Sequence, residues 1–136
     1  MNVYRGFLLY LIMLGAFFAI DMTWLGVVAR GFYRNQIGPL MADSVNWLAA
    51  IIFYLLFIVG VLLFVVNPAL EEESLWRAVG MGILFGVITY STYDLTNLST
   101  LQGWPLKMTI VDIIWGGVLS ASISVVGYLV YNALWG

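Results

Sequence analysis

Four long apolar stretches dominate this chain and constrain its fold more than any other feature of the sequence. They cover approximately residues 6–29, 47–66, 75–94 and 105–135. A helix of ~20 residues crosses the ~30 Å hydrocarbon core of a bilayer, and each stretch reaches that length. Strands are excluded because an open sheet edge cannot face lipid. The sequence therefore predicts an all-α integral membrane protein, with residues 1–136 forming a single transmembrane domain, a four-transmembrane-helix bundle.

The composition agrees with a lipid environment and excludes several classes of function. Hydrophobic residues make up 63% of the chain and charged residues 9%, whereas about a quarter of a soluble domain is charged. The chain has no basic tract, so we expect no nucleic-acid partner, because phosphate binding needs clustered Lys and Arg. It also has no Cys and no His, which excludes thiol chemistry, imidazole zinc sites and histidine relays.

The partner that the sequence predicts is the lipid bilayer, with the chain crossing it as a multi-pass protein. The cationic residues do not predict its orientation, because Arg30, Arg34 and Lys107 on one face balance Arg5, Arg77 and the amino terminus on the other. Small residues recur at four-residue spacing in the third and fourth stretches, for example at Gly82 and Gly86 and from Gly116 to Ser120 and Ser124. Such spacing favours close helix packing and also allows a homodimer.

Three aspartates interrupt the apolar stretches, and the order of the spans places them at one level of the membrane. Asp21 lies ~13 Å before Arg30 along a helix, Asp112 lies ~10 Å after Pro105, and Asp94 closes the third stretch. Successive spans run in opposite directions, so these three positions fall below the same surface. An ionised aspartate facing lipid costs ~3 kcal/mol or more, so we expect all three to face the bundle interior or a wet cavity.

Two of these aspartates share a local pattern with a tryptophan. Asp21 precedes Trp24 and Asp112 precedes Trp115 at the same offset, and Gly and Val follow in both copies. Residues three apart lie on one face of a helix, so we expect each aspartate to have the indole of its own helix beside it. The match arises by duplication or by chance. An inverted repeat would put the two copies at mirrored depths, whereas both lie near one face.

Several blocks of the sequence resemble domain-of-unknown-function family 2177. They are the segments Asp21-Met-Thr-Trp24-Leu25-Gly26, Phe32-Tyr33-Arg34, Phe64-Val65-Val66-x-Pro68-Ala69-Leu70, Thr92-Tyr93-Asp94-Leu95-Thr96-Asn97-Leu98, Trp104-Pro105 and Asp112-x-x-Trp115-Gly116. The resemblance spans nearly the whole chain, and the T-Y-D-L-T-N block is its most specific part. It implies a small protein of the bacterial inner (plasma) membrane with four helices. It implies no reaction, substrate or cofactor, so the chemistry must be argued from the residues.

The candidate substrate- or proton-binding residues come from the predicted aspartate layer and the connectors that cover it. They are Asp21, Asp94, Asp112, Trp24, Trp115, Asn97, Tyr93, Tyr33 and Arg34. Neighbouring carboxylates removed from water share protons, and aromatic rings attract organic cations. Tyr90 and Trp104 add to the aromatic residues at this level. We therefore favour binding or transport of a small molecule or cation, with no resident cofactor.

Two alternatives remain open on the sequence alone. In the first, the aspartates are structural: they accept hydrogen bonds, or pair with Arg34 or Lys107, in an accessory membrane scaffold. In the second, their oxygen atoms hold Mg²⁺ or Ca²⁺ in a metal-dependent membrane enzyme, because such ions prefer oxygen ligands. No catalytic motif accompanies the aspartates, so we rank the enzyme below the two non-enzymatic functions and assign no catalytic residue.

Overall fold

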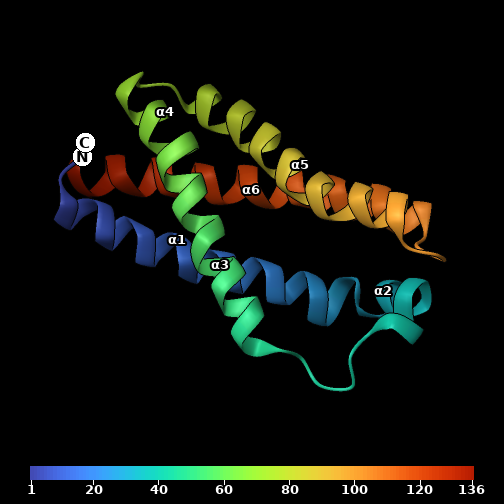
Figure 1. The fold of residues 1–136 in the computed structure, drawn as a ribbon. Helices are drawn as coiled ribbons and strands as arrows, with labels where there is room; N and C mark the ends of the chain where they lie inside the picture. The colour runs from blue at the N-terminus through green and yellow to red at the C-terminus, as the bar shows by residue number, and fades with distance from the viewer.

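The computed structural model describes the whole chain, Met1 to Gly136, and contains helices but no strand. Four helical segments are long and apolar enough to cross a membrane: Val3–Val28, Trp47–Glu71, Leu75–Thr100 and Leu106–Trp135. The all-α membrane architecture with four spanning helices is thus confirmed. Both chain ends lie together at one end of the bundle (Figure 1), as an even number of crossings requires.

The spans are built from the following helical elements. The first span contains α1 (Val3–Thr23) and the π-helical turn η1 (Trp24–Val28). The second contains α3 (Trp47–Val61), the π-helical turn η3 (Leu62–Val66) and α4 (Asn67–Glu71). The third and fourth are the continuous helices α5 (Leu75–Thr100) and α6 (Leu106–Trp135). The first connector forms α2 (Arg30–Ile37) and the 3-10 turn η2 (Gly38–Leu40), at the end of the bundle away from the termini (Figure 1).

The second span is longer than the sequence predicted. We expected it to end at residue 66, before Pro68, but the helix continues through this proline to Glu71. Proline donates no backbone hydrogen bond, and its ring crowds the carbonyl four residues earlier. The preceding turn, η3, is wider than an α-helical turn: the N–H of Asn67 bonds to the carbonyl of Leu62. This wider turn makes room for the ring without ending the helix.

The third span is also longer than predicted, and this changes the position of Asp94. We expected the helix to close at residue 94, yet it continues to Thr100. The hydroxyl groups of its last turns bond within their own helix: Thr92 donates to the carbonyl of Ile88, and Thr100 to that of Thr96, each at 2.8 Å. A polar stretch therefore remains helical. Asp94 consequently lies inside the span, at a depth similar to that of Asp21 and Asp112.

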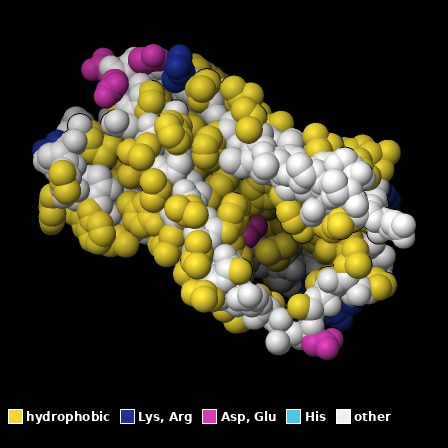
Figure 2. Space-filling view, in the orientation of Figure 1, with side chains coloured by type: hydrophobic (Ala, Val, Ile, Leu, Met, Phe, Trp, Pro, Cys, Tyr) yellow, Lys and Arg dark blue, Asp and Glu magenta, His cyan; other side chains and the backbone are white.

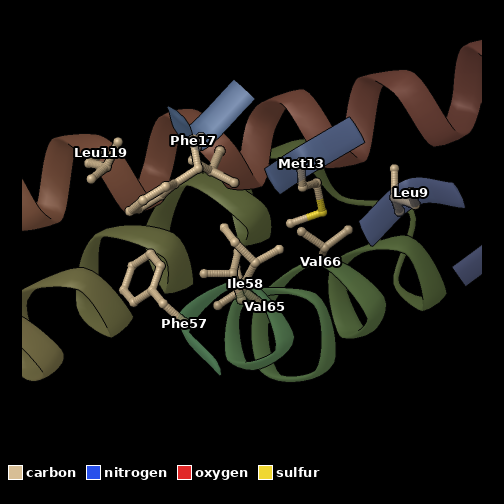
Figure 3. Close-up of a cluster of buried hydrophobic side chains, with 10 residues drawn as sticks. Leu9, Met13, Phe17, Phe57, Ile58, Val65, Val66 and Leu119 are labelled. Carbon is tan, nitrogen blue, oxygen red and sulfur yellow. The ribbon is translucent and has the colours of Figure 1, made fainter. Parts of the chain in front are cut away.

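The hydrophobic core lies where the second span crosses α1 and α6. It comprises Leu9, Met13, Phe17, Phe57, Ile58, Val61, Val65, Val66, Leu119 and Ile123. Figure 3 shows Met13 and Phe17 of α1 on one side of this cluster and Ile58 and Val66 of the second span on the other. The buried residues of α3 all belong to its C-terminal part, from Phe57 to Val61. The N-terminal half of α3 therefore extends beyond the core.

Close packing of α5 against α6 fixes the other half of the bundle. A Cβ added at Gly86 would lie 2.1 Å from the carbonyl oxygen of Gly116, and one at Gly82 would lie 2.9 Å from the Cα of Ala121. These distances leave no room for a side chain. The small residues at four-residue spacing thus bring the two backbones into contact, as predicted.

Candidate functional site

A cavity of about 460 Å³ opens into the side of the bundle and is bordered by all four spans. Figure 2 views the bundle from the side and shows a hollow between α3 and the C-terminal half of α5, with acidic atoms inside it. The lining residues are Asp21, Leu25, Ala50, Phe53, Tyr54, Thr89, Tyr90, Tyr93, Asp112 and Trp115. A mostly apolar cavity of this size with a few convergent polar groups is typical of a small-molecule site.

Asp21 is buried at the cavity and is bonded to a tryptophan from another helix. The indole N–H of Trp115 in α6 donates to Oδ1 of Asp21 at 3.2 Å. We expected the indole of Trp24 to accompany Asp21 on its own helix, but the indole that bonds to Asp21 is that of Trp115. Trp24 begins the π-helical turn η1 and instead stacks on Trp115, with ring centroids 4.3 Å apart and planes 9° from parallel. The two D-x-x-W segments are therefore joined to each other across the bundle.

Tyr33 of α2 connects this stack to Asp112. Its hydroxyl donates to Oδ1 of Asp112 at 2.7 Å and accepts from the indole N–H of Trp24 at 3.1 Å. Burial, followed by the hydrogen bond to Asp112, raises the pKa of Tyr33 above its ordinary value. Tyr33 consequently keeps the proton that it donates. The connector that the sequence placed over the aspartates thus contributes a direct partner to one of them.

Asp94 completes the layer from behind the cavity wall. It has no exposed surface, and no backbone N–H, side-chain amide or hydroxyl group donates to its carboxyl oxygens. Asp112 is the neighbouring acid that interacts with it, and Asp112 also interacts with Asp21. Neighbouring carboxyl groups that interact behave as a pair rather than as two independent acids. Asp112 therefore links the cavity to a buried acid that the cavity does not reach.

No basic side chain neutralises these acids. The only ion pair in the chain joins Arg77 to Glu72 at 3.5 Å, next to the connector between the second and third spans. Arg34 and Lys107 are exposed and pair with no acid. The Asp–Arg34 or Asp–Lys107 pair considered in the structural hypothesis is therefore not formed. Asp21 and Asp112 face the cavity with hydrogen-bond donors beside them but no cation.

Of the remaining predicted residues, some line the cavity and others lie outside it. Tyr93 lines the cavity, whereas Asn97 and Arg34 do not. Trp104 is buried outside the cavity, edge-on to Tyr93 at a centroid distance of 5.6 Å. Sequence reasoning missed Phe53 and Tyr54 of α3, because the second span carries no charged residue that signals a site.

The three carboxylates do not form a metal site by their arrangement. No group of three or more His, Cys, Asp or Glu side chains in the chain is gathered so that it could hold an ion. The oxygen ligand set considered above for Mg²⁺ or Ca²⁺, Asp21 with Asp94 and Asp112, thus lacks the geometry of a preformed site.

The comparison with known families agrees with the membrane architecture. A family described as a predicted membrane protein (DUF2177) matches residues 6–129. The chain belongs to the DUF2177 family. The resemblance carried by the T-Y-D-L-T-N and D-x-x-W blocks is thus confirmed, and the match covers every residue that lines the cavity. No curated protein and no solved structure matches the chain. The DUF2177 description gives a membrane protein and names no reaction or ligand.

Proposed function

We propose that this DUF2177 protein binds a small organic cation within the bacterial inner membrane and exchanges it for protons. The observation that carries the proposal is a cavity where two carboxylates without a counter-cation meet five aromatic side chains. Asp21 and Asp112 supply the negative charge, and the rings are those of Phe53, Tyr54, Tyr90, Tyr93 and Trp115. Aromatic faces attract an organic cation, and the attraction strengthens when water is excluded.

The buried pair of Asp112 and Asp94 provides a route for the protons. When no ligand is bound, a proton held by these carboxyl groups avoids the cost of unpaired charge inside a bilayer. An incoming cation supplies the charge that the proton supplied, so one proton leaves as one monovalent cation binds. This exchange keeps the net charge of the site constant, which suits a protein that moves cations across a membrane against protons.

A structural function is the second candidate, and two hydrogen bonds favour it. Trp115 bonds to Asp21 and Tyr33 to Asp112, so both acids also hold separate elements of the bundle together. An accessory scaffold would need these bonds and no ligand. Replacing each aspartate by asparagine separates the two functions, because asparagine keeps the oxygen that accepts these bonds and removes the charge.

We expect Asp21→Asn and Asp112→Asn each to weaken binding of tetraethylammonium at least tenfold, because the cation loses a carboxylate. The measurement is equilibrium binding to the purified protein in lipid nanodiscs. Asp43→Asn is the matched control, because Asp43 is exposed in the connector before α3 and does not line the cavity. In proteoliposomes with a pH gradient, the same two variants should lose uptake of the cation. Unchanged binding in both variants would show that the acids are structural, and no binding of the cation by the wild type would reject the proposed function.

A further inference from the structure

We propose that the ligand of this site is an amphiphilic ammonium ion that reaches the cavity sideways from the bilayer. The inference rests on the proposed function and names its substrate class. It comes from the position of the cavity mouth, which faces the side of the bundle between α3 and the C-terminal half of α5, next to the connector that precedes α3 (Figure 2). A ligand outside this mouth is in lipid.

The mouth exists because the second and third spans diverge. The second span is held against α5 at η3, whereas α3 packs mainly on α1 and α6. The N-terminal half of α3 therefore leaves the core without closing on α5, as Figure 1 shows for the two ribbons. The cavity lining includes Ala50 and Phe53 of α3 and Thr89 and Tyr93 of α5, so the gap between these two helices leads into the cavity.

The depth of the mouth places it beside lipid rather than beside water. With a rise of ~1.5 Å per residue, Thr89 and Tyr93 lie ~10–16 Å from the end of α5, and Asp21 lies ~10 Å from the end of the first span. Hydrocarbon fills ~30 Å of the bilayer, so this level is at or below the boundary between headgroups and acyl chains. Phe53 and Tyr93 line the cavity and still expose 43% and 54% of their surface.

The side chains of the cavity wall and of the cavity base favour a ligand with an alkyl chain and an ammonium group. The outer wall consists of apolar and aromatic side chains that tolerate an alkyl chain running back into the bilayer. The base holds the carboxylates of Asp21 and Asp112, which bind an ammonium group. A strongly hydrated ion such as Na⁺ gains nothing from this route, because it would have to lose its water to cross lipid, whereas tetraethylammonium holds its water weakly. Single-chain amines and lipids with an ammonium headgroup share this chemistry, and the experiment separates them from a cation that arrives from water.

Competition between a soluble and a lipid-confined ammonium ion tests the route. Wild-type protein is placed in nanodiscs that contain a two-chain trimethylammonium lipid, with an equal amount of anionic phosphatidylglycerol to keep the surface neutral. We expect the lipid to weaken tetraethylammonium binding at least tenfold relative to nanodiscs without it. Binding of tetraethylammonium that depends on Asp21 but is unaffected by the lipid would overturn lateral access and leave the proposed function intact. Absence of binding by either cation would reject both.

A substitution at the mouth gives a second, independent readout. Ala50→Phe adds a ring at the edge of the cavity and should reduce competition by the lipid. Leu48→Phe is the matched control on the same helix, because Leu48 is 72% exposed and lies outside the cavity.

A photoreactive group next to the ammonium of the lipid locates the headgroup without any variant. Labelling at Phe53 or Tyr93 that excess tetraethylammonium prevents supports the inference, and labelling only on outward residues such as Leu84 contradicts it.

Discussion

At the scale of single residues, the site depends on donors that come from elements other than those bearing the acids. Asp112 of α6 receives its hydrogen bond from Tyr33 of α2, and Asp21 of α1 receives its bond from Trp115 of α6. These contacts join parts of the chain that are 79 and 94 residues apart. A buried acceptor that loses its donor destabilises the fold by ~1–3 kcal/mol. The aspartates are therefore bound into the architecture as well as exposed to the cavity.

Tyr33→Phe tests this dependence. The change removes the donor to Asp112 and the acceptor for Trp24, so we expect the free energy of unfolding to fall by ~1–3 kcal/mol. Thermal unfolding in detergent measures the change. Tyr4→Phe is the matched control, because Tyr4 is 70% exposed and makes no side-chain hydrogen bond. Equal stability of the two variants would show that the Tyr33 hydroxyl contributes nothing.

The raised pKa of Tyr33 also predicts how this difference varies with pH. A group whose pKa is higher in the folded state contributes stability that is constant below its pKa in the unfolded state, which is near 10 for tyrosine. The contribution declines above that pH, because only the unfolded state then loses its proton. Ionisation of Tyr33 should consequently leave the stability difference between wild type and Tyr33→Phe unchanged between pH 6 and 9. The difference should decrease above about pH 10. A loss of the difference below about pH 9 that tracks tyrosine ionisation would contradict this assignment.

At the scale of helices, the pair formed by α5 and α6 provides the rigid wall of the cavity. Gly86→Ala should destabilise the protein by ~3 kcal/mol, because the added Cβ would lie 2.1 Å from the carbonyl oxygen of Gly116. Gly80→Ala on the same helix is the control, since a Cβ there meets no atom within 4 Å. Alanine forms helix better than glycine, so this control should match or exceed the wild type. Similar melting temperatures for both variants would contradict such close packing.

At the scale of the whole molecule, the cavity ties ligand binding to the association of the four spans. Its lining comes from every span, so a bound cation should stabilise the bundle against unfolding. Tetraethylammonium at about 100 times its dissociation constant should add ~2.7 kcal/mol. The readout is the melting temperature in nanodiscs, with tetraethylammonium chloride compared against equal sodium chloride. An equal increase in Asp21→Asn, whose cavity lacks one carboxylate, would assign the effect to salt or lipid.

The sequence by itself determined the solvent, the fold class and the level of the acids. Four apolar stretches of membrane-crossing length admit only helices, and alternating directions place Asp21, Asp94 and Asp112 below one surface. The helix ends were less predictable. Pro68 and the hydroxyl-rich end of α5 both resemble helix ends in the sequence. In the structure the second span continues past Pro68 because the preceding turn is wider. The third span continues to Thr100 because its hydroxyl groups bond within the helix.

Only the tertiary structure decided which groups meet and where the cavity opens. The indole of Trp115 bonds to Asp21 and that of Trp24 bonds to Tyr33. These partners depend on the orientation of each helix about its own axis. Helical periodicity relates residues on one helix but does not give the rotation of one helix against another. Phe53 and Tyr54 line the cavity because α3 diverges from α5. This divergence results from the angle at which the second span crosses the core. Crossing angles result from the packing of side chains distant in sequence, and no local pattern encodes them.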